Sequence, residues 1–389
     1  MDRRSRLVDD GTRLLYGDLH NHSLFSDGAG DPEHAFEQMR AAGLDVAALT
    51  DHASIPQHQV EFLDLTHYPD EDALALGRTP PRSIDDEGWK RTAELADAHD
   101  VPGHFTALRG FEWTEPWLGH VNVWFCDDYL PVTTPGAISG LHEFLRFDQP
   151  EALFGYNHPG REPGRFGEFT QLDAVDLGER MVALEAFNRR TDHLFTGYRD
   201  GLTSPLVACL DAGWRPGIIG SSDTHSRGYG LAGLGRTGIW AREHSRAGVR
   251  EALLARRTYA TREVGLRLDA TLGGTRMGDT LAPGPATREL AVDLSVDTAG
   301  SAYDGRRVQL QLLSGDGTRS PAVIDVIAAR VGEVTRAQVL LPQHPWLLLR
   351  VGDPERRNDV PGPGDHPASA WGVAYASPWW LPVAPGMVE

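Results

Sequence analysis

Two histidines, His20 and His22, stand one residue apart in the segment Asp18–Asp27, which reads Asp-Leu-His-Asn-His-Ser-Leu-Phe-Ser-Asp. Imidazole is the commonest metal ligand, and two imidazoles at this spacing can reach one ion if an extended segment bends over it. The pair alone is a weak signal, because a chain with 16 histidines contains such a spacing by chance. It gains weight only if other ligands converge on it.

Further imidazole and carboxylate side chains lie at the ends of short apolar runs. Each of them alone could be a hydrogen-bonded core histidine or a helix N-cap, and Asp223 in Ser-Ser-Asp fits the second description. Mixed imidazole and carboxylate ligands suit Zn, Mn, Fe or Ni rather than an all-oxygen calcium site. Too many candidates are present for one ion, so we expect a cluster of two or three. The candidate ligands are His20, His22, Asp27, His52, Glu112, His120, His158, Asp223 and His225.

The elements that must position these residues are predicted strands. Apolar runs separated by helical patterns indicate parallel strands covered on both faces. A barrel of β/α units is the natural architecture, with its active site at the C-terminal ends of the strands. One short connection, Thr114–His120, could instead make a hairpin. The predicted strands are Leu14–Leu19, Val46–Thr50, Phe105–Phe111, Val121–Phe125, Leu153–Tyr156, Val182–Phe187, Ile218–Ser221 and Gly238–Ala241.

Helix signals support this alternation. Asp31, Pro32 and Glu33 form an N-cap, a proline at the first helical position and an acid in the first turn, and Gly43 ends that helix. A second helix is expected around Ser245–Arg256. Residues Ser54–Gly88 form a long excursion with several prolines, which is either a substrate-shaping lid or a plain insertion.

The pattern changes near residue 264. Beyond it, short alternating runs punctuated by Gly, Pro and Asp predict an antiparallel β-sandwich. We therefore expect two domains: an α/β barrel over residues 1–263 and a small accessory sandwich over residues 264–389, which could cover the barrel or mediate homo-oligomerisation. The runs are Leu266–Leu272, Glu289–Val296, Val308–Leu313, Gln338–Leu341, Trp346–Val351 and Val373–Ala376.

The composition narrows the class of partner. Acids outnumber bases 55 to 37, which gives a formal charge of −18. Such a balance argues against duplex nucleic acid or an anionic membrane surface as a partner. No apolar run approaches the ~20 residues that span a bilayer. The two cysteines, Cys126 and Cys209, lie among apolar neighbours, so we expect reduced core residues in a cytoplasmic protein.

The ordered motifs resemble the PHP (polymerase and histidinol phosphatase) family of metal hydrolases, and within it the CehA/McbA-type metallohydrolases. The matching segments are Asp18–Asp27, Thr50-Asp51-His52, Gly110-Phe111-Glu112-Trp113, Gly119-His120-Val121-Asn122, His158-Pro159, Gly213-Trp214-Arg215-Pro216-Gly217, Ser222-Asp223-Thr224-His225 and Tyr375-Ala376-Ser377-Pro378. The resemblance is strong over residues 14–262 and loose beyond them. It implies a distorted (β/α)7-like barrel and two or three divalent ions, Zn, Mn or Fe.

The resemblance also implies how the ligands are shared. His20, His22, Glu112 and Asp223 would hold the first ion. Glu112 would bridge to a second ion completed by His120 and His158. Asp27, His52 and His225 would hold the third.

Other residues near the motifs have expected supporting roles. Asp51 and Asp18 would assist Glu112 in catalysis by accepting the second N–H of ligand imidazoles, although either carboxylate could simply cap a turn. Guanidinium groups bind phosphate through two hydrogen bonds, so nearby arginines are candidates for substrate binding. The candidate substrate-binding residues are Arg161, Arg165, Asn188, Arg189 and Arg227.

The expected function is hydrolysis by a metal-activated hydroxide. A phosphoesterase acting on a phosphate mono- or diester of a small metabolite or nucleotide is the first hypothesis. The same cluster could instead hydrolyse a carbamate or carboxylic ester. A non-catalytic metal-binding module is the remote alternative, and the complete ligand set counts against it.

Overall fold

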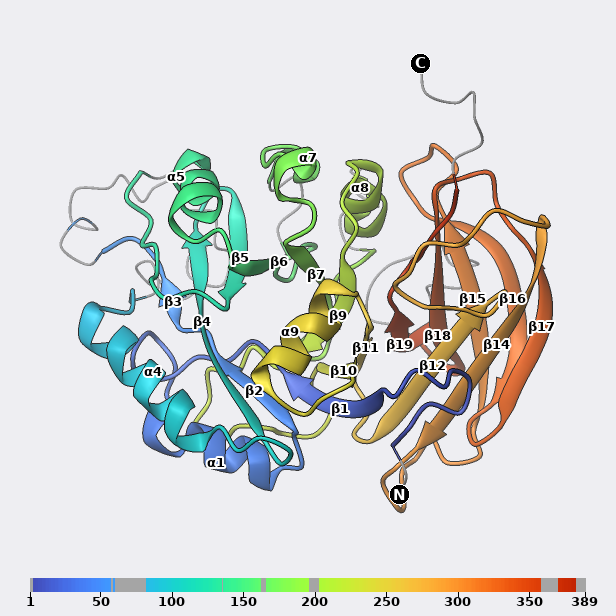
Figure 1. Cartoon of the computed structure of the whole chain (residues 1–389), viewed down its shortest axis with the longest axis horizontal. Helices are drawn as coiled ribbons and strands as arrows, with labels where there is room; N and C mark the ends of the chain where they lie inside the picture. Colours follow the sequence, from blue (N-terminus) through green and yellow to red (C-terminus); the bar gives the residue numbers. More distant parts are fainter. Residues whose placement is uncertain are drawn as a thin grey trace.

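The computed structural model describes residues 3–56, 59, 82–134, 136–161, 166–195, 203–357 and 370–382. Most of the expected excursion Ser54–Gly88 lies outside the described residues. The chain is a strand-rich mixture of helices and strands: helices gather around the N-terminal two-thirds, and the last third consists of strands (Figure 1). The helices are α1 (Pro32–Ala41), α4 (Asp86–His99), α5 (Ser139–Glu143), the π-helix η2 (Phe144–Asp148), α6 (Phe166–Phe169), α7 (Ala174–Leu177), α8 (Pro205–Asp211) and α9 (Arg246–Leu254).

The N-terminal two-thirds contains all the strands that carry candidate ligands. Their apolar side chains are almost completely buried, as the continuous apolar runs predicted. The strands are β1 (Arg13–Asp18), β2 (Val46–Leu49), β3 (His52–Ala53), β4 (Thr106–Glu115), β5 (Gly119–Trp124), β6 (Leu153–Tyr156), β7 (Met181–Asn188), β8 (Thr191–Asp192), β9 (Gly217–Ser221), β10 (Arg236–Ala241) and β11 (Thr258–Thr261).

The first helix shows how local sequence fixes these elements. The Asp31 side chain accepts a hydrogen bond of 3.0 Å from the backbone N–H of Glu33, and Pro32 occupies the first turn. Phe36 and Met39 are buried on one face, and Gly43 follows the helix with φ +84°. None of the described helices is both long enough and apolar enough to cross a membrane.

The large sheet mixes parallel and antiparallel pairs. β1, β2 and β4 are parallel neighbours, as are β6, β7 and β9, but β4–β5 and β5–β6 are antiparallel. The hairpin that we considered for Thr114–His120 is therefore present as β4–β5. A hairpin leaves no room for the helix that a parallel crossover requires. The distorted (β/α)7-like barrel that we expected is accordingly not shown by the described residues, which form a strand-rich mixture of helices and strands.

The ends of this strand series meet without a ladder of backbone hydrogen bonds. β9 pairs with β7, and the Thr237 hydroxyl on β10 joins it to β10 by accepting from Gly220 N at 3.2 Å and donating to Gly220 O at 2.8 Å. β10 in turn pairs with β1. The strands thus curve around a common interior, with the C-terminal ends of β1, β2 and β9 on one rim.

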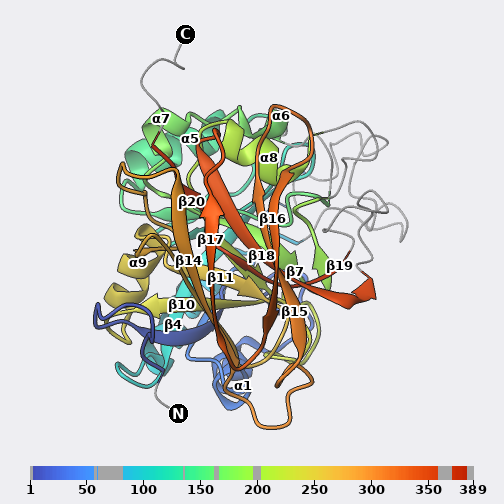
Figure 2. The same ribbon diagram turned by 90° about the vertical axis from the view of Figure 1, so that its right-hand side faces the viewer.

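The C-terminal strands form two antiparallel layers (Figure 2). One layer is a separate sheet in the order β13-β12-β14-β17, and the other continues the large sheet, because β19 pairs with β11. The expected boundary at 264 falls between β11 and β12, and strands on its two sides share backbone hydrogen bonds. The strands are β12 (Leu266–Leu272), β13 (Thr275–Arg276), β14 (Thr287–Val296), β15 (Arg307–Ser314), β16 (Ala322–Arg330), β17 (Val334–Leu340), β18 (Trp346–Arg357), β19 (Ala370–Ala376) and β20 (Trp379–Trp380).

Candidate metal centre

Glu112 on β4 lies at the centre of the candidate ligands. Its side chain is 1% exposed, and its two carboxylate oxygens face five imidazoles that come from four different segments. The distances from the nearer Glu112 oxygen are 3.2 Å to His20 Nε2, 3.5 Å to His22 Nε2, 2.7 Å to His52 Nδ1, 3.3 Å to His120 Nδ1 and 3.4 Å to His158 Nε2.

A first group of ligand atoms comprises His20, His22 and Asp223. The two Nε2 atoms lie 3.1 Å apart, and Asp223 Oδ1 lies 3.1 Å from His22 Nε2 and 3.5 Å from His20 Nε2. All three side chains are buried. Asp223 has φ +45°, a left-handed conformation that non-glycine residues rarely adopt and that costs of order 1–3 kcal/mol unless the surroundings hold it.

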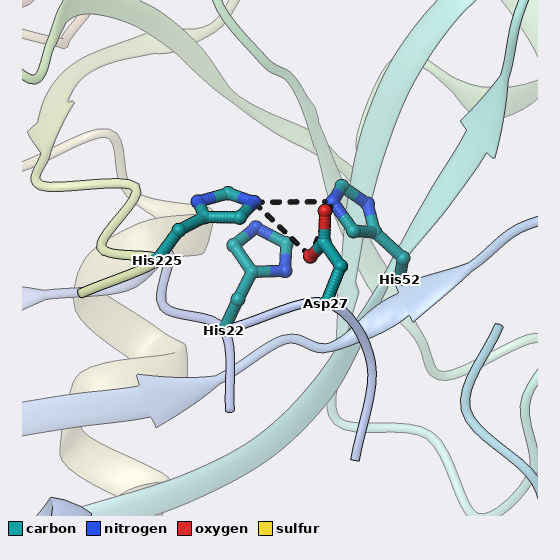
Figure 3. Close-up of side chains that lie close together, drawn as sticks. All are labelled: His22, Asp27, His52 and His225. Carbon is teal, nitrogen blue, oxygen red and sulfur yellow. Dashed lines mark hydrogen bonds and ion pairs between the residues drawn. The ribbon is translucent and has the colours of Figure 1, made fainter. Parts of the chain in front are cut away.

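A second group joins His22, Asp27, His52 and His225 (Figure 3). Asp27 Oδ1 lies 3.4 Å from His52 Nε2 and 3.3 Å from His225 Nε2, and these two nitrogens are 3.3 Å apart. The His22 ring packs against the other two rings with centroid distances of 4.1 Å. The Asp27 side chain is 33% exposed, so this group faces solvent, whereas the first group does not.

The third group contains His52, Glu112 and His120. His52 contributes here through Nδ1, whereas its Nε2 faces Asp27. The His52 Nδ1 atom is also 2.7 Å from the Thr114 hydroxyl. His158 joins this group through Glu112, 3.4 Å from its Nε2, and through ring packing on His120 at a centroid distance of 4.9 Å.

The expected division of ligands is therefore close to what the structure brings together, with two differences. All nine candidate ligands converge, but His22 belongs to both the first and the second group, and His52 lies between the second and the third. For His52 the two ring nitrogens explain this sharing, because Nδ1 faces Glu112 and Nε2 faces Asp27.

The donor set and its spacing fit divalent metal ions. Two ligand atoms about 2.1 Å from one ion lie roughly 3.0–3.4 Å apart at bond angles between octahedral and tetrahedral. The distances of 3.1 Å between His20 Nε2 and His22 Nε2 and of 3.3 Å between His52 Nε2 and His225 Nε2 agree with this. Nδ1 of His22 is buried and has no hydrogen-bond partner in the described part of the chain, which fits an atom that could bind a metal ion.

The pKa shifts of the cluster histidines also fit a site for divalent metal ions. Burial opposes the charge of His20, but Glu112 and Asp223 outweigh it and raise the His20 pKa well above the ordinary value. Likewise, Asp223 and Asp27 overcome burial and raise the pKa of His225 to about 9. Burial lowers the pKa of His158 well below the ordinary value. Without a metal ion, the carboxylates are thus balanced by protons on two imidazoles, and divalent cations would take over that role.

Glu185 on β7 is a functional residue that the sequence analysis missed. It is fully buried, with Oε1 3.1 Å from His20 Nδ1 and Oε2 accepting hydrogen bonds from His158 N at 2.7 Å and Asn188 Nδ2 at 2.9 Å. A carboxylate that accepts the second N–H of a ligand imidazole fixes the ring and raises its basicity. The available signal was a single acid inside the apolar run Val182–Phe187.

The roles expected for Asp51 and Asp18 need correction. Asp51 accepts hydrogen bonds from Ser23 N at 2.7 Å, Ser23 Oγ at 2.8 Å and Ser26 Oγ at 2.6 Å, so it holds the loop between His22 and Asp27. Asp18 accepts from Ser222 N at 3.1 Å, and burial raises its pKa to about 6. Both carboxylates therefore stabilise turns, the alternative left open above, and Glu185 occupies the imidazole-orienting position at His20.

The candidate substrate-binding residues lie in different surroundings. Arg189 lies at the rim, with Nη2 3.2 Å from His225 Nδ1 and Nε 3.4 Å from Asp223 Oδ2. Burial lowers the pKa values of His120 and His158, and the nearby positive charge of Arg161 lowers them further. Arg227 is exposed. Asn188 is a correction, because its amide is bonded to Glu185, and Arg165 lies outside the described residues.

Comparisons with known proteins give distant likenesses. A family model described as a protein of unknown function (DUF3604) matches residues 49–128, and no curated protein matches. A two-domain protein of Bacteroides vulgatus ATCC 8482 that contains a predicted PHP-like metal-dependent phosphoesterase is 17% identical with a TM-score of 0.44, over 97% of this chain and 99% of that one. PsfC of Pseudomonas syringae PB-5123 is 15% identical with a TM-score of 0.34, over 63% and 90%. Endonuclease Q bound to a duplex with an abasic lesion is 12% identical with a TM-score of 0.33, over 62% and 56%.

Proposed function

We propose that this protein is a metal-dependent hydrolase that acts on phosphate mono- or diesters of small molecules. The observation that carries the proposal is the convergence of five imidazoles on the buried Glu112, at distances of 2.7–3.5 Å from its carboxylate oxygens. Such a set of imidazole nitrogens and carboxylate oxygens is costly to bury unless positive charge balances the carboxylates, a role that divalent cations would fill.

Divalent ions held here would supply a nucleophilic water at neutral pH and would polarise the substrate oxygen under attack. His20, His22, Glu112 and Asp223 would hold the buried part of the cluster. Asp27, His52 and His225 would hold its solvent-facing part, where a substrate can enter. Glu185 keeps the His20 ring fixed by accepting its Nδ1–H.

Arginine placement favours a phosphate ester as substrate. The Arg189 side chain is 46% exposed and reaches His225 and the Asp223 carboxylate, so its guanidinium lies beside the solvent-facing ligands. Arg161 adds a second positive charge near His120 and His158. Guanidinium groups match the geometry of phosphate oxygens. A carbamate or carboxylic ester has no comparable need for two arginines.

The test measures metal content and hydrolysis on one preparation. We expect the metal-loaded protein to hydrolyse an aryl phosphate mono- or diester faster than an aryl carbamate or acetate. Glu112→Ala should lose both metal and activity, whereas Glu87→Ala, at an exposed position of α4, should lose neither. A protein that keeps its full metal content and hydrolyses no ester contradicts the proposal, and preferential carbamate hydrolysis contradicts the substrate class.

A further inference from the structure

We propose that the C-terminal strands are part of the active site, because they hold the turn that carries Arg189 over the metal ligands. The inference rests on the proposed function for its effect on substrate, but the positioning itself is independent of it. The turn consists of Arg189 and Arg190, which connect β7 to β8. The positioning residues are Arg262, which directly follows β11, Arg350 on β18 and Tyr375 on β19.

The turn is held in a conformation that it would not adopt on its own. Arg189 has φ +53°, in the left-handed region that favours glycine. Its backbone is bonded on both sides, with N donating to Ser221 O at 3.1 Å and O accepting from Gly235 N at 2.8 Å. The side chain consequently leaves the turn toward Asp223 and His225.

Arg262 ties the other residue of the turn to β19. Its Nη1 donates to Arg190 O at 2.6 Å, and its Nε donates to Gly372 O at 3.1 Å. The guanidinium is stacked between two aromatic rings, 3.6 Å from the Trp371 centroid and 4.4 Å from that of Phe187. Arg262 is 2% exposed, so this connection is shielded from water.

Asp192, the second residue after the turn and the last residue of β8, is the second attachment point. Its Oδ2 accepts a hydrogen bond of 2.7 Å from the Tyr375 hydroxyl and lies 3.5 Å from Arg350 Nη2. Arg350 also donates to Tyr375 Oη and to Gln311 Oε1, both at 2.7 Å. All four side chains are completely or almost completely buried. The β8 strand is thus bonded through side chains to β18 and β19, and Arg350 extends this network to Gln311 on β15.

The close approach at Gly372 is independent support. A Cβ at this position would lie 2.9 Å from Asp192 Oδ2, 3.0 Å from Arg350 Nη2 and 3.3 Å from Phe187 Cζ. These neighbours are buried, and Asp192 and Arg350 are also held by hydrogen bonds, so they cannot move aside easily. The β19 backbone therefore packs directly on β7 and β8, the strands on either side of the turn.

The first experiment needs neither metal nor substrate. Tyr375→Phe removes the hydroxyl between Asp192 and Arg350 and keeps the ring. Tyr303→Phe is the matched control, because this buried tyrosine donates to Asp353 at 3.1 Å, within the C-terminal strands. Amide hydrogen exchange of residues 188–193 should become about fivefold faster or more in Tyr375→Phe and stay unchanged in Tyr303→Phe. Unchanged exchange in Tyr375→Phe overturns the inference.

The second experiment asks whether the effect reaches substrate through Arg189. With an aryl phosphate ester, Tyr375→Phe should raise KM about three- to tenfold with little change in kcat, as Arg189→Ala does to a larger extent. In the Arg189→Ala background, Tyr375→Phe should have no further effect on KM. A full additional effect in that background overturns the inference. If the wild type hydrolyses no ester, the proposed function fails, and the exchange experiment alone decides the positioning.

Discussion

The two nitrogens of the His20 ring face two different glutamates, Glu185 on one side and Glu112 on the other. Nδ1 lies 3.1 Å from Oε1 of Glu185, and Nε2 lies 3.2 Å from Oε1 of Glu112. Glu185 also binds His158 N, so one buried carboxylate aligns two segments that carry candidate ligands. Since Nδ1–H is bonded to Glu185, the Nε2 lone pair is the one available to a metal ion.

We expect Glu185→Gln to lower metal affinity about 10- to 100-fold, the usual loss when a partner of a ligand histidine is removed. Both oxygens of Glu185 accept hydrogen bonds, so an amide group at this position meets a donor whichever way it turns. Retained metal should be measured after dialysis against graded chelator. Glu115→Gln is the control, since that buried glutamate accepts from the backbone of Trp117 and Leu118. Equal metal retention in both variants would show that Glu185 does not support the ligands.

Metal binding should release protons. At pH 7 the metal-free cluster carries protons on His20 and on His225, whose pKa is raised to about 9, and both must leave before these nitrogens bind a metal ion. Metal affinity should therefore rise with pH. Calorimetric titration with zinc in two buffers of different ionisation enthalpy should give at least about one proton released per protein. Heats that do not depend on the buffer would contradict this.

The same pKa shift makes a prediction for the stability of the metal-free protein. A histidine whose pKa is raised from about 6.5 on folding stabilises the fold fully below that value and loses this contribution as pH rises. For His225 the loss falls between about 6.5 and 9. The Tm of the metal-free protein should thus fall from pH 7 to pH 9. The Tm of the metal-loaded protein should not show this fall between pH 7 and pH 9.

Asp51 variants should separate a turn-holding role from an imidazole-orienting one. Asparagine keeps an oxygen for Ser23 N and Ser26 Oγ, and its amide can donate to Ser23 Oγ, so Asp51→Asn should cost less than about 1 kcal/mol. Asp51→Ala leaves buried groups unpaired and should cost about 1–3 kcal/mol per group. Urea unfolding of both variants provides the comparison. An Asn variant as unstable as the Ala variant would indicate that the charge itself is needed.

Gly235 should tolerate no side chain. A Cβ there would lie 2.4 Å from Ser221 O and 2.5 Å from Phe187 O, which are backbone atoms that cannot rotate away. We expect Gly235→Ala to lower the free energy of unfolding by about 1–3 kcal/mol. Gly140→Ala on α5 has open space around its Cβ and should be neutral or stabilising by up to about 1 kcal/mol. Equal stability of the two variants would contradict the close approach.

The sequence indicated the candidate ligands more completely than the residues that hold those ligands in place. Candidate ligands such as His52 and Glu112 were recognisable because they follow apolar runs, and strand ends at one rim bring such residues together. Glu185 was missed because a lone acid inside an apolar run has no spacing signal. Its partners, His20 and His158, are far away in the sequence and become neighbours only when β1, β6 and β7 assemble.

The limits of the fold prediction have a similar cause. Leu266–Leu272 was predicted with its observed bounds, because all its residues are buried and the run is flanked by turn residues. The predicted Gln338–Leu341 begins earlier, at Val334, since this strand is mostly exposed and Val339 is its only side chain classed as buried. The antiparallel β4–β5 pair was only one of two alternatives. Strand direction in such short connections depends on tertiary pairing that periodicity does not contain.

The pairing of β11 with β19 bears on how this chain can be divided for study. Residues Tyr259–Thr261 hydrogen-bond to Ala374–Ala376, more than 110 positions away. A fragment ending at residue 263 would leave the outer side of β11 with unpaired N–H and C=O groups, beside apolar side chains that the later strands cover. Such an open strand is a template for intermolecular pairing and aggregation. Expression of the N-terminal part alone should therefore give inclusion bodies or oligomers rather than a smaller enzyme.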